Sequence, residues 1–146
     1  MRVSVSFEER YWYPDDGGIV WLAGYSLVDP DSGDFLARDD PRVRERGLLV
    51  ANVAGARFHE EALQSAGAAP GRSLVLRRDP DNPHDPDAVA VDTEDGTHLG
   101  FVPRELAPRV GDGWSAVALR ESRPSPRDPR TGLTMLLAPE PEILLD

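Results

Sequence analysis

The segment RDPDNPHDPDAVAVDTEDGTHLGFVPRE, residues 78–105, decides the fold. It opens with a loop of Asp, Asn and Pro, continues into the apolar run 88–91 (AVAV), and then turns at 94–96 (EDG). A second apolar run, 99–102 (LGFV), follows the turn. Two short apolar runs around an acidic turn that contains Gly predict a β-hairpin. Pro103 stands where a helix tolerates proline best, in its first turn, and so predicts a short helix at 104–110.

The rest of the chain repeats this pattern of short apolar runs between turn residues. Acidic residues at its start and Gly67 at its end predict a second short helix at 60–66. We expect a mainly β protein: a small OB-like or SH3-like β-barrel of about six strands with two short helices. Further strands are predicted at 3–7, 19–27, 48–54, 73–78, 114–120 and 133–137, and the tail 143–145 either adds to an edge or frays.

The length of 146 residues fits one core domain with an extension. We expect residues 1–47 to form an N-terminal extension with one or two strands that packs on the core, and residues 48–146 to form the barrel. Exposed aromatic side chains of the extension would stack on bases or dock a partner, whereas buried ones would cover an edge of the core. Burial is the favoured interpretation. Seven of the ten aromatic residues lie in the extension: Phe7, Tyr11, Trp12, Tyr13, Trp21, Tyr25 and Phe35.

Charge and composition exclude several classes of protein. The chain has 26 acidic and 16 basic residues and a formal net charge of −10, which argues against charge-driven wrapping of nucleic acid or of an anionic membrane. Any nucleic-acid site must therefore be local. There is no cysteine and no apolar run approaching the roughly eighteen residues of a membrane span. A cytoplasmic protein without a membrane partner is expected.

The sequence contains no motif for metal-dependent or nucleophilic chemistry. Counted from Asp79, a calcium loop would need an oxygen donor at position five, Gly at six and Glu at twelve, but these positions hold Pro83, His84 and Ala90. The three histidines are too scattered for a zinc motif. No nucleophile elbow and no HExxH motif is present. We predict no catalytic residue, no metal and no cofactor, and hence no enzyme.

The loop 79–87 has two interpretations. Its three prolines fix their own φ angles and restrain the residues before them, so the loop is rigid before it binds anything. His84 and Asp85 lie at its crest, where an imidazole beside a carboxylate can stack on a base and accept a hydrogen bond from a hydroxyl. The alternative is an Asx-type turn, in which the Asp and Asn side chains bind their own backbone.

Three segments of the sequence form a recognisable pattern in order: 53–59 (VAGARFH), 74–91 (LVLRRDPDNPHDPDAVAV) and 99–107 (LGFVPRELA). Through these segments, residues 50–107 resemble a HIRAN domain, a module found at the N-terminus of some DNA-repair helicase-like remodellers and as stand-alone bacterial proteins. The resemblance implies a small OB-like barrel that binds the 3′ end of single-stranded DNA.

The resemblance also implies roles for six residues, all of them contacts to DNA. The family often has Tyr where this chain has His84, and a polar or basic residue is found where Phe101 stands. By position, phosphate would be bound by Arg57 and Arg104, terminal bases would be stacked or flanked by Phe58 and His84, the same pocket would be lined by Phe101, and the 3′-hydroxyl would donate to Asp85.

The predicted function is therefore a non-enzymatic nucleic-acid-binding module that recognises the 3′-hydroxyl end of single-stranded DNA, linked to DNA repair or processing. A helicase or nuclease activity would come from another polypeptide. The alternative is a HIRAN-fold protein-interaction module that does not bind DNA.

Overall fold

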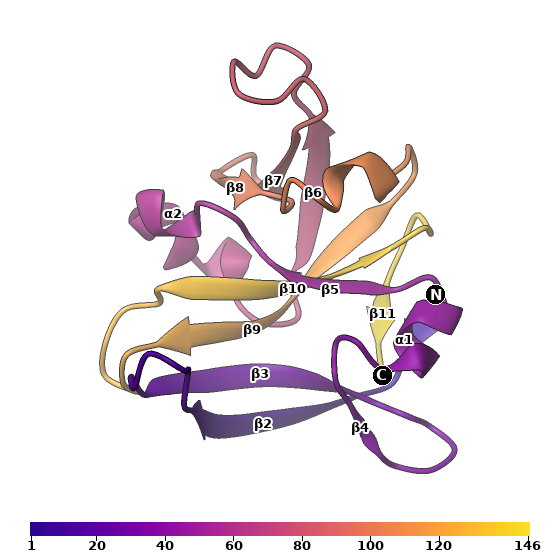
Figure 1. Cartoon of the computed structure of the whole chain (residues 1–146), viewed down its shortest axis with the longest axis vertical. Coiled ribbons are helices and arrows are strands. Elements are labelled where there is room, and N and C mark those ends of the chain that lie inside the picture. The colour runs from indigo at the N-terminus through magenta and orange to yellow at the C-terminus, as the bar shows by residue number, and fades with distance from the viewer.

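The computed structural model describes all residues 1–146 and confirms a mainly β chain (Figure 1). Two α-helices, α1 (Pro41–Glu45) and α2 (Glu60–Leu63), and three 3-10 helices, η1 (Ala56–Phe58), η2 (Ala66–Ala68) and η3 (Ala107–Arg109), join the strands. The strands are β1 (Arg2–Val3), β2 (Val5–Trp12), β3 (Val20–Val28), β4 (Phe35–Leu36), β5 (Leu49–Asn52), β6 (Ser73–Arg78), β7 (Val89–Thr93), β8 (His98–Phe101), β9 (Ser115–Arg123), β10 (Gly132–Ala138) and β11 (Leu144–Leu145).

The helices differ in place and length from those predicted. Helix α2 covers part of the predicted segment 60–66, and the predicted helix at 104–110 is a turn followed by η3. Helix α1 was not predicted, although its capping signals are present: the Asp40 carboxylate accepts from the Arg42 backbone N–H, and Pro41 occupies the first turn. No helix is both long and apolar enough to cross a membrane.

Strand β9 is the centre of the main sheet. Strand β10 pairs along one edge of β9 and also pairs with β5. The opposite edge of β9 is shared, because β6 pairs near Ala116 and β3 pairs near Arg123. Figure 1 shows β2, β3, β9 and β10 running across one layer, with β6 and β7 rising from it. The sheet therefore divides at β9 into an N-terminal part, β2 and β3, and a strongly curved part, β6 to β8.

The six strands β5 to β10 do not close into a continuous barrel. In space the six strands follow the order β5, β10, β9, β6, β7, β8. The two ends of this run, β5 and β8, are joined only by an isolated bridge, in which Ala54 and Phe101 exchange backbone hydrogen bonds of 2.8 and 2.9 Å. Gly100 permits this contact, since a Cβ atom there would lie 2.4 Å from the Ala54 carbonyl oxygen, and its φ of 155° disfavours other residues. Pairing stops there because Gly55, at φ 75°, turns the chain into η1. The predicted barrel closure is thus incomplete, although the mainly β class holds.

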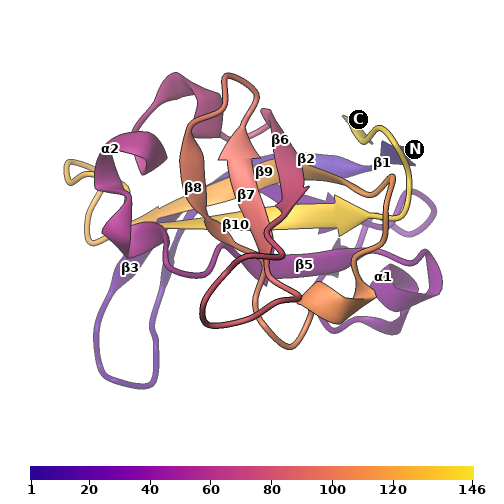
Figure 2. The same cartoon turned by 90° about the horizontal axis from the view of Figure 1, so that it is seen from above.

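The hairpin of β2 and β3 extends the sheet beyond β9. Its register is unbroken from Val5 opposite Leu27 to Trp12 opposite Val20, and β2 pairs with no other strand. Figure 2 shows the end of this hairpin projecting from the rest of the molecule.

The aromatic residues of the extension do not all become buried. Phe7, Tyr11, Trp12 and Tyr13 are 55%, 54%, 54% and 69% exposed. The favoured interpretation that such residues cover an edge of the core is wrong for these four and for Phe35, which is 61% exposed; Phe7, Tyr11 and Trp12 lie on β2, the outer edge of the sheet, and Tyr13 follows it. Phe7 packs edge-to-face on Tyr25 across the hairpin, with the ring centroids 5.5 Å apart.

Two apolar cores lie on opposite faces of β9 and β10. The larger contains Ala116 and Ala118 of β9, together with Leu63 of α2. The smaller contains Val117 and Leu119, which alternate with them and therefore point to the other face. Segments α1, β1 and β11 cover the smaller core, and the region from η1 to β8 is built on the larger one.

A buried ionic cluster of Glu121, Arg123 and Arg130 connects β9 with its neighbours. Glu121 is only 7% exposed at its side chain, and its carboxylate forms ion pairs with Arg123, at 2.7 Å, and with Arg130. Arg130 also donates to the Leu63 carbonyl at the end of α2, at 2.9 Å. The guanidinium of Arg123 lies over the Trp21 ring, 5.5 Å from its centroid. The Glu121 cluster thus contacts both the N-terminal hairpin and the segment that carries α2.

Candidate nucleic-acid interface

Strand β8 brings together the segments that carry most of the predicted site. Its last residue, Phe101, lies opposite Ala90 of β7 on one edge and bridges Ala54 on the other. Helix η1, with Arg57 and Phe58, begins two residues after Ala54. Two distant stretches of the sequence therefore meet at the end of β8.

Helix η1 presents a cation and an aromatic ring together. The Phe58 backbone N–H donates to the Gly55 carbonyl at 3.0 Å, which closes the turn. The guanidinium carbon of Arg57 lies 4.8 Å from the centroid of the Phe58 ring, within the range of a cation–π contact. Phe58 is 73% exposed. An exposed ring with an arginine held against it can offer a stacking surface and a positive charge to the same ligand.

The loop 79–87 is ordered by its own side chains. The Asn82 side-chain oxygen accepts from the backbone N–H groups of His84, at 2.9 Å, and Asp85, at 3.1 Å. Asp85 Oδ1 in turn accepts from the Asp87 N–H at 2.9 Å. The Asx-turn interpretation is therefore confirmed for Asn82 and Asp85, and it leaves the second carboxylate oxygen of Asp85 outside the turn.

That second oxygen, Oδ2 of Asp85, faces Arg104. It lies 3.9 Å from Arg104 Nε, which is a loose ion pair and longer than a hydrogen bond. The Asp85 side chain is 17% exposed and that of Arg104 is 79% exposed. Arg104 follows Phe101 by three residues, so this pair lies beyond the same end of β8. Asp85 thus keeps an oxygen that can still accept a hydrogen bond, next to an exposed positive charge.

Four of the predicted residues form two pairs near Phe101, and His84 lies apart from both pairs. The pairs are Arg57 with Phe58 and Asp85 with Arg104. His84 is exposed at the loop crest, and its imidazole makes no hydrogen bond, ion pair or ring contact.

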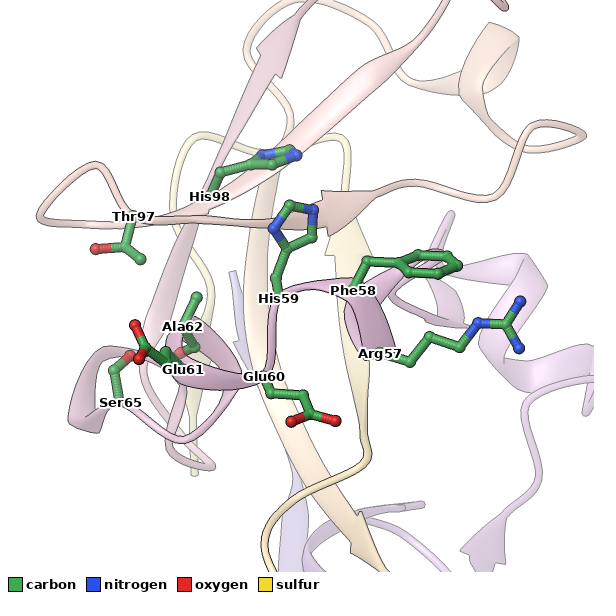
Figure 3. Close-up of a pocket in the computed structure, with 9 residues that line it drawn as sticks. All are labelled: Arg57, Phe58, His59, Glu60, Glu61, Ala62, Ser65, Thr97 and His98. Carbon is green, nitrogen blue, oxygen red and sulfur yellow. The ribbon is translucent and has the colours of Figure 1, made fainter.

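A shallow pocket of about 660 Å³ lies between η1, α2 and the start of β8 (Figure 3). Figure 3 shows His59 and His98 pointing toward each other, while Glu60 points away from them. The His59 and His98 rings pack edge-to-face at 4.8 Å, and His98 packs on Phe101 at 5.0 Å. The pocket is lined by Arg57, Phe58, His59, Glu60, Glu61, Ala62, Ser65, Thr97 and His98.

A buried carboxylate fixes the orientation of His98. Asp92 Oδ1 lies 2.9 Å from His98 Nδ1, and Asp92 Oδ2 accepts from Arg77 Nε at 2.9 Å. Burial alone would raise the pKa of Asp92, but the hydrogen bonds from Arg77 and His98 outweigh it and hold this pKa below its ordinary value. The ionised carboxylate therefore anchors both partners.

Sequence reasoning missed His59 and His98 because it considered these two histidines only as metal ligands. No group of three or more His, Cys, Asp or Glu side chains is placed to hold a metal ion. A usable signal was present: His59 follows Phe58 directly, and His98 precedes Phe101 by three residues. Their contact depends on the approach of η1 to β8, which no local pattern encodes.

Several known proteins are similar to this chain. It is 28% identical over 85 residues to the mouse helicase-like transcription factor and 30% identical over 82 residues to the human protein, which covers 58% and 56% of this chain. It is 45% identical over 58 residues, 38% of this chain, to the Fanconi-associated nuclease 1 homolog of Oryza sativa subsp. japonica. The matched segments make up only 8%, 7% and 6% of these relatives.

Among solved structures, the HIRAN domain of human HLTF is similar, with a TM-score of 0.43 at 23% identity over 62% of this chain and 74% of that one. The HIRAN domain model matches residues 46–123. This match includes η1, the loop 79–87 and β8, and it covers more than half of the sequence. The chain belongs to the HIRAN domain family.

Proposed function

We propose that this chain is a non-enzymatic module that recognises the 3′-hydroxyl end of single-stranded DNA. The proposal is supported by the Arg57–Phe58 contact and the Asp85–Arg104 ion pair, which lie on segments close in sequence to the Ala54–Phe101 bridge at the end of β8. The helicase-like and nuclease relatives support a role in DNA processing, with the catalytic activity supplied by another polypeptide.

The two arginines and the aromatic ring would provide affinity without reading sequence. Arginine forks bind phosphate through two hydrogen bonds. Stacking of a base on Phe58 contributes roughly 1–3 kcal/mol and tolerates any base. Phe101, flanked by His98, would form the inner wall of the same site.

Asp85 would provide the preference for a free end. A hydroxyl can donate to its free Oδ2, whereas a phosphate at the same place would be repelled by the carboxylate. Arg104 is loosely paired with this oxygen, so it can turn toward the last phosphate without breaking a hydrogen bond.

The acidity of the chain limits the affinity. With a net charge of −10, and with Glu60 and Glu61 lining the pocket, we expect weak binding, a footprint of a few nucleotides and loss of binding at moderate salt.

The test is fluorescence anisotropy with a short labelled oligonucleotide that carries a 3′-hydroxyl, a 3′-phosphate or a duplexed 3′ end. The single-stranded 3′-hydroxyl should bind best. D85N keeps the acceptor for the turn but removes the charge, so it should reduce the preference for hydroxyl over phosphate. R57A should lower the affinity for every single-stranded oligonucleotide. It should also reduce the slope of log K against log salt by about 0.7 if one phosphate contact is lost.

The matched control is R44A, which removes an exposed arginine of α1 outside the matched segment and should change nothing. Equal binding of all three ends, or unchanged affinity of R57A and D85N, would refute the proposal. Incubation of the chain with DNA and divalent metal should give no cleavage.

A protein-interaction module without DNA binding is the second candidate. The exposed aromatic face of the β2–β3 hairpin favours it, because that face lies outside the matched segment and among acidic residues. Absence of any DNA binding, with retained partner binding through this face, would support it.

A further inference from the structure

Strand β2 is an unprotected edge of the main sheet. It pairs with β3 over its whole length without a register shift, and no strand pairs with its other side, where only the Val5 N–H is engaged, by the Asp146 carbonyl. It contains no proline and no glycine, and the eight residues 5–12 are extended. Edge strands are usually protected by proline, bulges or charged side chains, especially lysine, which hinder pairing with another chain. Strand β2 has no proline, bulge or lysine, and its charges, on Glu8, Glu9 and Arg10, are of both signs. The absence of proline, bulge and lysine makes β2 a template for a further strand.

The outward hydrogen-bonding groups of β2 follow from its register. The Val28 N–H donates to the Ser4 carbonyl, and in an antiparallel pair the residues that bond across the ladder alternate. Ser6, Glu8 and Arg10 therefore bond toward β3, while the backbone groups of Phe7, Glu9 and Tyr11 point out of the sheet. Consistent with this alternation, the N–H of Val5 is turned outward and donates to the Asp146 carbonyl.

We propose that two copies of this chain associate through β2, antiparallel about a two-fold axis with Glu9 opposite Glu9. A two-fold interface uses the same surface on both copies, so β2 must complement itself. In this register Phe7 lies opposite Tyr11 twice, and Glu8 lies opposite Arg10 twice. About six backbone hydrogen bonds join the outward groups.

The charges favour this register over its neighbours. Shifting the two-fold axis by one residue along β2 in one direction places Glu8 opposite Glu8, and in the other direction places Arg10 opposite Arg10. Both arrangements put like charges together. In the proposed register these side chains form two opposite-charge pairs. The Glu8 and Arg10 side chains are 29% and 54% exposed; within one chain Glu8 Oε1 accepts from Ser26 Oγ at 2.5 Å and lies 3.6 Å from Arg10 Nε, which leaves Oε2 and the other guanidinium nitrogens for the second copy.

Backbone geometry reduces the effect of the one like-charge pair. The Glu8–Arg10 pairs occupy non-hydrogen-bonded positions, where Cα atoms lie about 4.5 Å apart and side chains approach closely. The Glu9–Glu9 pair occupies a hydrogen-bonded position, where the Cα separation is about 5.5 Å. The attractive pairs therefore have the shorter spacing, and the repulsive pair the longer one.

The aromatic face continues across the proposed seam. Phe7 and Tyr11 are on the same face of β2, over Tyr25 and Trp21 of β3. Pairing places each Phe7 beside a Tyr11 of the second copy, and cross-strand aromatic pairs stabilise a sheet by roughly 0.2–1 kcal/mol each. A single-strand seam lies at the small end of interfaces, below about 1,200 Å², so a micromolar dissociation constant is expected.

Sedimentation velocity of the full chain over a concentration series tests the proposal. The wild type should shift from monomer to dimer in the micromolar range. R10E and E8R each create two like-charge pairs and should weaken the dimer at least tenfold, while E8R/R10E restores the opposite-charge pairs and should recover most of the affinity. E9Q removes the central repulsion and should tighten the dimer.

Two controls distinguish association through β2 from nonspecific association and from misfolding. F35K changes an exposed aromatic residue of β4, 61% exposed, and should leave the dimer unchanged. Far-ultraviolet circular dichroism and thermal melts should show that each variant folds. A monomer at all concentrations overturns the proposal, and so does a dimer in which E8R/R10E is no tighter than R10E. Neither outcome depends on whether the chain binds DNA.

Discussion

The pocket beside η1 and the outer face of the β2–β3 hairpin both expose aromatic side chains, in different charge surroundings. Phe58 has Arg57 against its ring, and Phe101 lies in the chain just before Arg104. Around Phe7 and Tyr11 the exposed strand carries two acidic residues and one basic residue, Glu8, Glu9 and Arg10. The aromatic rings alone would suit bases or proteins equally. The arginine held against Phe58 fits the proposed phosphate contact, and the mixed charges of β2 fit the proposed pairing with a second copy.

The two regions also differ in how their strands end. Strand β8 meets the opposite end of the curved sheet through the bridge to Ala54, so part of its edge is paired. Strand β2 has an open edge. The first arrangement holds η1 close to the end of β8, and the second leaves backbone groups available for association.

The largest effect is expected from G100A, which would disrupt the bridge between the end of β8 and Ala54. A Cβ atom at this position would lie 2.4 Å from the Ala54 oxygen, and φ is 155°. Backbone strain and overpacking each cost about 1–3 kcal/mol, so we expect a loss of about 3 kcal/mol or more in the free energy of unfolding, measured with urea. DNA affinity should fall with it, since η1 would move away from β8.

The matched control for this experiment is G96A. Gly96 also has a positive φ, 89°, but no atom lies within 4 Å of a Cβ atom there. It should lose only about 1–2 kcal/mol. Equal losses in G96A and G100A would mean that the close approach to Ala54 does not matter.

A smaller effect is expected from removing one ring in each region. F58A should weaken single-stranded DNA binding by about 1–3 kcal/mol, roughly 5- to 150-fold, measured by anisotropy. F7A should leave DNA binding unchanged and weaken the dimer. If F7A weakens DNA binding as much as F58A does, the two surfaces are not distinct.

The smallest effect concerns the carboxylate that supports His98. The pKa of Asp92 is held below its ordinary value, so its ionised form stabilises the fold above about pH 4 and this contribution is lost as the pH falls through the lowered pKa. D92N should therefore lower the free energy of unfolding by about 1 kcal/mol at pH 7, and the difference from wild type should shrink below pH 4. Urea unfolding at both pH values measures it, with D81N as the exposed control. A difference that does not change with pH would contradict the assignment.

Much of the β-structure could be predicted because its signals are local. Strand β6 has the predicted bounds 73–78, and the hairpin of β7 and β8 follows from the apolar runs around the acidic turn. Strand β4 and helix α1 were not predicted because they are very short and lie in a polar stretch of the sequence. The residues 104–110 contain good helix signals, but the chain forms a turn and η3 there, since Val110 and Ala107 are held in the larger core.

The site was predictable only where its residues are close in sequence or carry the family pattern. Arg57 with Phe58 needs one turn at Gly55, and Asp85 needs the Asx turn of its own loop. The ring contacts of His98 with His59 and Phe101 depend on long-range geometry. In particular, they depend on the register shift after Val91, which brings Asp92 opposite His98. Sequence periodicity gives no information on such a shift.

The Glu121 cluster has a consequence for the evolution of this chain. Because one buried carboxylate holds Arg123 and Arg130, losing it would leave two guanidinium groups without their partner, one against the Trp21 ring and one at the end of α2. Selection should therefore treat the three residues as a unit. In relatives that carry a comparable N-terminal hairpin, we expect substitutions at 121, 123 and 130 to covary, so that lineages keep the trio or replace it together.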